Sequence, residues 1–334
     1  MRLTSNIISK LKKIITKSRL IKLSLLLFLL LILLFPAASF AGAKSGLILW
    51  WDTLLPTLLP FMIISGIIIR LRVSNAISVL LYPILKHLLP ISKDGCYSIF
   101  IGFLAGMPIG AKTTADLKIQ RGLPEDEAQM LCAVCNNASP MFIISYIAGA
   151  NLATPKLAIP LIIILYSSSL ISGLLMYHCF LTHRRKKSEI SCVSACSSTA
   201  SNGICFELID DAILSAFEVV TKVGGYILLF SVLASLLSTI PLPFKNVTAF
   251  FTGILEITTG IHNIAVLSLS KEIKIVLITT IAAFGGLSGF AQTKSVLGSS
   301  GLSSSIYFFT KLLCAAIAFL LSTLLITLRL VNIF

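Results

Sequence analysis

Charged residues are scarce in this sequence, and acidic residues are scarcer than basic ones. Asp, Glu, Lys and Arg make up 12% of the 334 residues, whereas about a quarter is usual in soluble domains. Hydrophobic residues make up 56%, and the mean hydropathy is +0.98. This composition excludes an ordinary soluble domain. Several apolar stretches approach the roughly 20 residues that a membrane-spanning helix needs, so the sequence predicts an all-α polytopic membrane protein.

Motifs of common enzymes and metal sites are also missing. The sequence shows no Ser-His-Asp arrangement, P-loop, GxSxG motif or HExxH motif. Cys132 and Cys135 have CxxC spacing, but no second CxxC and no histidine pair lies near them. We therefore expect no enzymatic activity, no cofactor, no metal site and no disulfide scaffold.

Basic residues exceed acidic ones by 27 to 13, which gives a formal net charge of +14. They cluster at residues 10–22, before the first apolar run, and at residues 183–187, after a later one. Basic residues beside membrane spans face the cytoplasm and contact anionic headgroups. No basic platform interleaved with aromatic residues, as single-strand binding needs, is present. The expected partner of the basic residues is the lipid bilayer and not nucleic acid.

The first apolar run allows two interpretations. It extends from Leu23 to Phe35 and is followed by the small residues of AASFAGA, so it resembles a cleavable signal peptide. Because many spans follow, we favour a retained signal-anchor that forms a first transmembrane helix over residues 23–41. The sequence leaves cleavage open.

A glycine-rich signature occurs twice, as GMPIGAKTTADL from Gly106 to Leu117 and as GLSGFAQTKSVL from Gly286 to Leu297. Each copy interrupts an apolar segment, and interrupted segments at corresponding positions of two halves mark a transport site. The signature predicts two Gly-rich re-entrant helical hairpins in a two-fold internal repeat, among about 7–9 transmembrane helices. An inverted arrangement of the halves is favoured only by analogy with other transporters, and a parallel arrangement stays open.

The repeat suggests four regions in the chain. They are a basic N-terminus with the first transmembrane helix at 1–45, a first repeat at 46–182, a cytoplasmic polar loop at 183–206 and a second repeat at 207–334.

A helix that restarts after a glycine break exposes unpaired N–H groups and a partial positive charge, which favour an anion. Lys112 and Thr113 lie in the first turn after one break, and Gln292 and Thr293 occupy the same positions after the other. The segment CNNASP adds polar residues inside a third apolar helix, where such groups are costly and usually functional. We predict a site for a small polar or anionic solute, formed by Gly106, Gly110, Lys112, Thr113, Asn136, Asn137, Ser139, Ser288, Gln292 and Thr293.

Two acidic residues are candidates for coupling to an ion, Asp116 and Glu256. An ion pair between Asp116 and a nearby lysine is the alternative for Asp116. For the glycines and serines the alternative is close helix packing.

Four segments in order, GFLAGMPIGAKTTADL, CNNASPMFI, FFTGILEITTGI and FGGLSGFAQTKSVL, resemble the sporulation integral membrane proteins of the YlbJ (SpoVV) type. These carry two nucleoside-recognition, or Gate, domains and are distantly similar to concentrative nucleoside transporters. The resemblance implies a multi-pass protein in a membrane surrounding the forespore, and transport of dipicolinic acid. The chain lacks a pair of acidic ribose-binding residues in its expected hairpins, which argues against nucleosides. A nucleoside-type permease and a structural sporulation protein without transport activity are the alternatives. A homo-oligomer or other sporulation membrane proteins are left open as partners.

Overall fold

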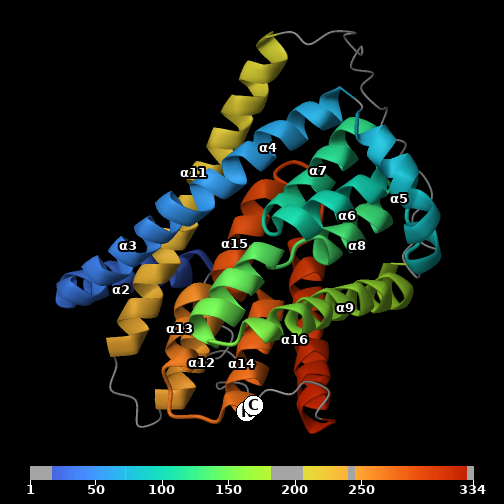
Figure 1. The fold of residues 1–334 in the computed structure, drawn as a ribbon. Helices are drawn as coiled ribbons and strands as arrows, with labels where there is room; N and C mark the ends of the chain where they lie inside the picture. The colour runs from blue at the N-terminus through green and yellow to red at the C-terminus, as the bar shows by residue number, and fades with distance from the viewer. Residues whose placement is uncertain (1–16, 72, 182–205, 240–244, 329–334) are drawn as a thin grey trace, which may run out of the picture.

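The computed structural model of the protein describes residues 17–71, 73–181, 206–239 and 245–328, which form helices and no strands (Figure 1). The basic residues before 17 and nearly all of the polar loop expected at 183–206 lie outside this part of the chain. The helices are α2 (Lys17–Leu34), α3 (Pro36–Ile48), α4 (Leu55–Arg70), α5 (Ser74–Leu88), α6 (Lys93–Ala105), α7 (Ile109–Arg121), α8 (Glu125–Val134), α9 (Ala158–Met176), α11 (Phe206–Thr239), α12 (Lys245–Leu255), α13 (Ile257–Ala265), α14 (Lys271–Phe284), α15 (Gly286–Leu297) and α16 (Ser304–Thr327). Shorter helical segments are η1 (Leu49–Leu54), η2 (Phe142–Asn151), η3 (Pro155–Leu157) and η4 (Tyr177–Leu181).

Four helical stretches of the described chain are long and apolar enough to cross a membrane. They are Pro155–Cys179, Phe206–Thr239, Lys271–Leu297 and Ser304–Thr327. Two sharply bent helix pairs raise the number to six if each pair counts as one span. The predicted all-α polytopic architecture is therefore confirmed, but the span count is lower than the expected 7–9. Several apolar segments form short helices that pack in pairs, such as α6 with α7 and α12 with α13.

The first apolar run is not the straight helix expected over residues 23–41. The chain bends by 104° between α2 and α3, where Pro36 occupies the first turn of α3. Proline has no N–H to donate to the preceding turn, so it starts a helix more readily than it continues one. Beyond the bend, α3 packs along α11, with Gly42 against the backbone of Ser231 (Figure 1).

The first glycine signature forms a helical hairpin of α6 and α7 (Figure 1). Gly106 ends α6 with φ +77°, a backbone conformation that favours glycine. The two arms come so close to the break after α8 that a Cβ on Gly102 or Gly110 would lie 2.4 or 1.9 Å from the carbonyl oxygen of Cys135. The hairpin is thus held against the end of α8 by backbone contact.

The second glycine signature does not form a hairpin, which corrects the expectation. Only Gly285 separates α14 from α15, and the two helices together make the single candidate span Lys271–Leu297. The hairpin of the second half is instead α12 and α13, which reverse at Glu256. A Cβ on Gly260 would lie 1.9 Å from the Cα of Gly253, so the two arms are in direct backbone contact. Glu256 has an extended backbone that reverses the chain, whereas Gly285, with φ +82° and ψ 1°, interrupts the helix without reversing it.

The order of elements is nevertheless similar in the two halves. The first half contains a hairpin (α6–α7), a broken helix (α8–η2) and a long helix (α9). The second half contains a hairpin (α12–α13), a broken helix (α14–α15) and a long helix (α16) in the same order.

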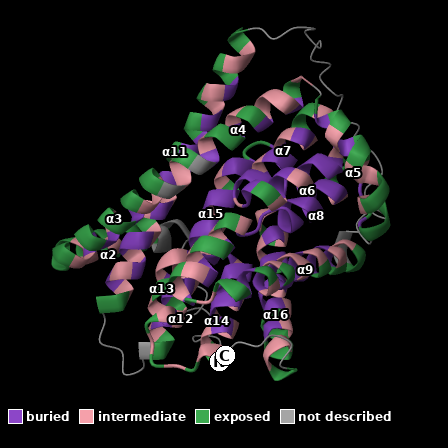
Figure 2. Cartoon of the chain, in the orientation of Figure 1, coloured by how far each residue is buried: buried purple, intermediate pink, exposed green. Residues whose placement is uncertain are grey.

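Buried residues gather on α6, α8 and α15 (Figure 2). The breaks in the helices therefore lie in the interior of the fold.

The close approach of α7 to α8 predicts a strong effect of a single methyl group. Gly110→Ala would place a Cβ against the carbonyl oxygen of Cys135, and overpacking of this kind costs about 1–3 kcal/mol. We expect lower thermal stability of the purified protein in detergent. Gly225→Ala is the matched control, because no atom lies within 4 Å of its added Cβ. Equal stability of the two variants would contradict the packing described for α7.

Candidate functional site

Breaks in four helical elements contact one another in the interior. The backbone N–H of Met107, in the turn of the α6–α7 hairpin, donates to the carbonyl oxygen of Asn137 in the break after α8, at 2.7 Å. The Met107 side chain lies against Gly285, where an added Cβ would be 3.4 Å from its sulfur. A Cβ on Gly286 would in turn lie 3.4 Å from the backbone nitrogen of Ile257, next to the turn of the α12–α13 hairpin. The two half-helix starts predicted from the sequence therefore do meet, with Met107 between them.

Asn136 joins the break after α8 to two helices of the second half. Its side chain is fully buried, and Nδ2 donates to Thr293 Oγ1 on α15 and to Tyr307 Oη on α16, both at 2.7 Å. Its Oδ1 is buried and has no hydrogen-bond partner. We call the group Asn136, Asn137, Thr293, Tyr307 and Lys311 the amide cluster.

Lys311 is the ionisable member of the amide cluster. The side chain is 2% exposed, and Nζ donates to the carbonyl oxygen of Asn136 at 3.0 Å and to Asn137 Oδ1 at 3.1 Å. Among the described residues no carboxylate pairs with it. The carbonyl oxygens at the end of α8 carry a partial negative charge, which a lysine stabilises.

Lys311 was not among the site residues predicted from the sequence, although a signal was present. The residue stands alone in the apolar run FFTKLLCAA of the last long helix. An ionisable residue inside a membrane span is rare and usually functional. Tyr307 carried no comparable signal, because tyrosine is common at membrane interfaces.

The predicted site residues do not form one constellation. Asn136, Asn137 and Thr293 meet in the amide cluster, whereas Gln292 Nε2 donates to Ser288 Oγ within α15, at 3.0 Å. The lysine expected beside them, Lys112, points elsewhere. Lys112 and Gln292 thus lie in separate surroundings, and the solute site that they were predicted to share stays a prediction.

Lys112 forms an ion pair with Asp116 one turn along α7. Its Nζ lies 2.5 and 2.7 Å from the two carboxylate oxygens. With Thr113, these residues line a cavity of about 110 Å³ between α4, α7 and α11. The alternative reading of Asp116, as the ion-pair partner of a lysine, matches this geometry.

Three predicted residues hold the breaks in place. A Cβ on Gly106 would lie 2.8 Å from the carbonyl oxygen of Asn137, and Gly110 contacts Cys135 in the same way. Ser139 Oγ accepts from the backbone N–H of Phe142 at 3.3 Å, where the helical chain resumes after the break. These contacts are those of close helix packing.

Glu256 is 2% exposed and caps α13. Its carboxylate accepts from the backbone N–H and the hydroxyl groups of both Thr258 and Thr259. These four hydrogen bonds fix the turn of the α12–α13 hairpin.

Among the described residues no group of three or more His, Cys, Asp or Glu is arranged to hold a metal ion.

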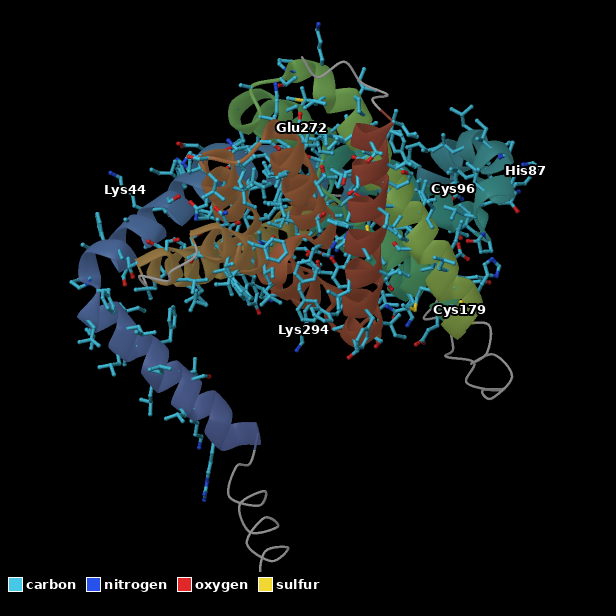
Figure 3. The ribbon with its side chains drawn as sticks, turned by 90° about the horizontal axis from the view of Figure 1, so that it is seen from below. Lys44, His87, Cys96, Cys179, Glu272 and Lys294 are labelled. Atoms are coloured by element: carbon cyan, nitrogen blue, oxygen red, sulfur yellow. The ribbon has the colours of Figure 1, made fainter. Side chains whose placement is uncertain are left out.

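Loss of the Lys311 amine should be costly. Lys311→Met leaves the Asn136 carbonyl and Asn137 Oδ1 without their donor, and an unpaired buried polar group costs about 1–3 kcal/mol. We expect a lower unfolding temperature in detergent. Lys294→Met is the control, because this lysine is exposed on α15 and points outward (Figure 3), where substitutions usually change stability by about 0.5 kcal/mol or less. An unchanged unfolding temperature of Lys311→Met would contradict the hydrogen bonds described for it.

The chain is 29% identical over 308 residues to the sporulation integral membrane protein YlbJ of Bacillus subtilis (strain 168), an alignment that covers 83% of this chain and 75% of that protein. No family model matches the chain, and no solved structure matches it. The similarity extends over most of both proteins and agrees with the several apolar helices of the fold. It supports a role of this chain in a membrane during sporulation. The chain is accordingly similar to a sporulation integral membrane protein of the YlbJ type.

Proposed function

We propose that this chain moves dipicolinic acid, or a similar small organic anion, across a membrane of the forespore by alternating access. The observation that carries the proposal is the contact between four helix breaks in the interior. Non-helical backbone at membrane depth is tolerated only where it is buried in protein or lines a wet cavity. Transporters place their substrate sites at such discontinuous helices.

The charges beside these breaks favour an anion. Lys311 is buried and pairs with no carboxylate of the described chain. The cavity beside α7 is lined by two cations, Arg70 and Lys112, and by one carboxylate, Asp116. A small planar dianion such as dipicolinate carries two carboxylates that lysine amines bind well. The choice of dipicolinate among small anions comes from the resemblance to the YlbJ type.

The Met107 contacts suggest where the protein would open. One backbone hydrogen bond joins the turn of the α6–α7 hairpin to the break after α8, and one side chain fills the space beside Gly285. The hydrogen bond lies within the first half, and the Met107 side chain is what the hairpin tip places against Gly285 and Gly289 of the second half. Movement of this tip would expose the amide cluster to one side of the membrane, as alternating access requires.

The amide cluster provides the test of transport. Purified protein in liposomes, with labelled dipicolinate outside, should show uptake that Asn136→Leu lowers at least about tenfold, the loss expected when an interaction of roughly 1.4 kcal/mol is removed. Asn136 joins three helices, so its loss disturbs the site directly. Asn246→Leu is the control, because Asn246 is exposed at the start of α12.

Two results would contradict the transport proposal, and a third would contradict only the place of its site. Uptake of labelled nucleosides without uptake of dipicolinate would indicate a nucleoside permease. Absence of both, in protein that is folded and inserted, would indicate a structural role. Normal dipicolinate uptake by a folded Asn136→Leu variant would remove the amide cluster from the transport path.

A further inference from the structure

We propose that the cavity between α4, α7 and α11 is a proton-controlled carboxylate site, in which a carboxylate of the solute replaces Asp116 at Lys112 when Asp116 takes up a proton. This inference rests on the proposed function and names its coupling ion. It also predicts binding that is measurable without transport.

The cavity is large enough and polar enough for such a group. Its volume is about 110 Å³, whereas one water takes up about 30 Å³ of liquid, so a carboxylate group fits together with water. Its polar lining comes from Ser65, Arg70, Lys112, Thr113, Asp116 and Gln120. The side chains of Lys112 and Asp116 are each 20% exposed, so both remain in reach of solvent.

Asp116 now occupies the position that an external carboxylate would take. Both of its oxygens lie within 2.7 Å of the Lys112 amine. A second carboxylate at the same amine would face the negative charge of Asp116 at close range, and like charges in a shared site disfavour joint ionisation. An anion can therefore bind Lys112 well only when Asp116 is neutral.

No other carboxylate lines the cavity. From α4 the charged group that faces Asp116 is Arg70, whose guanidinium lies 3.3 Å from Asp211 on α11. The residues that α11 contributes to the wall are uncharged, namely Ala212, Ser215 and Ala216. The other helices packed on α7, which are α6, α8 and α15, contribute none of the lining residues. Two carboxylates of α11 lie outside the lining, Asp211 at Arg70 and the exposed Glu218, which interacts with Lys112 electrostatically. Protonation of Asp116 thus removes the one carboxylate of the lining and leaves the Lys112 amine without its ion-pair partner.

The step is balanced in charge and atoms. One proton from solvent binds an Asp116 oxygen, the ion pair with Lys112 breaks, and a carboxylate oxygen of the solute accepts from the freed amine. Release reverses each change. Each bound anion is accompanied by about one proton, so affinity should fall up to about tenfold for each unit that the pH rises.

The first experiment uses the unaltered chain in detergent and dipicolinate as the probe. Calorimetric titration in two buffers of different ionisation enthalpy should give an uptake of about one proton per dipicolinate bound. Between about pH 6 and pH 8 dipicolinate itself stays a dianion, so the proton must go to the protein. Binding without proton uptake would overturn the inference.

Two variants then test whether Asp116 is the group that takes up the proton on binding. Asp116→Asn should bind dipicolinate with equal affinity at about pH 6 and about pH 8. Its neutral amide leaves the Lys112 amine without an ion-pair partner at either pH. Lys112→Gln should lose at least about tenfold in affinity at the lower pH. Glu125→Gln is the control: it removes the exposed carboxylate of the Lys118–Glu125 ion pair, which lies outside the cavity lining, and it should keep the pH dependence.

The outcomes separate this inference from transport. Persistent pH dependence in Asp116→Asn, or unchanged affinity in Lys112→Gln, overturns the cavity site even if liposomes take up dipicolinate. Proton-linked binding that Asp116→Asn abolishes, with no flux in liposomes, supports the cavity site and overturns the transport proposal.

Discussion

The structure depends on how the backbone groups at four helix breaks are satisfied away from water. The break after α8 exposes the carbonyl oxygens of Asn136 and Asn137, and each finds a donor from a distant part of the chain. Lys311 on the last long helix donates to the first, and the N–H of Met107 in the first hairpin donates to the second. A buried polar group without a partner costs about 1–3 kcal/mol, so both bonds stabilise the break, and the Lys311 bond also ties the second half of the chain to the first.

Glycine makes this arrangement sterically feasible. Gly110 and Gly260 each stand where a Cβ would come within 2 Å of another backbone atom. Because the helices meet backbone to backbone, the breaks are buried in protein, which is one of the two conditions under which irregular backbone is tolerated at membrane depth. The polar side chains near the breaks then divide into two groups, the amide cluster and the cavity beside α7.

The glycine repeat correctly predicted where two helices are interrupted, but it did not predict whether the chain reverses at each interruption. GMPIGAKTT and GLSGFAQTK align without gaps, yet the first contains a hairpin turn and the second a break within one long span. The structural counterpart of the first hairpin is the segment around Glu256, which the sequence suggested only as an ion-coupling candidate. Local similarity of glycine spacing shows where a helix is interrupted, but the direction of the chain after the interruption depends on the packing of the two arms.

The sequence by itself determined the all-α membrane character, the broken helix at Asn136–Asn137 and the break after Gly106, because hydropathy and helix-breaking residues act locally. Lys112 and Lys311 differ in how far the sequence predicted their partners. Lys112 was found from its place after a break, and its i,i+4 ion pair with Asp116 was already an alternative offered by the sequence. The cavity beside this pair, in contrast, exists only because α7 packs against α4 and α11. Lys311 acquired its role only from the tertiary structure, because 175 residues separate it from the Asn136 carbonyl that it stabilises. A contact over that distance along the chain leaves no spacing pattern to read, so the composition of the amide cluster was decided by the fold.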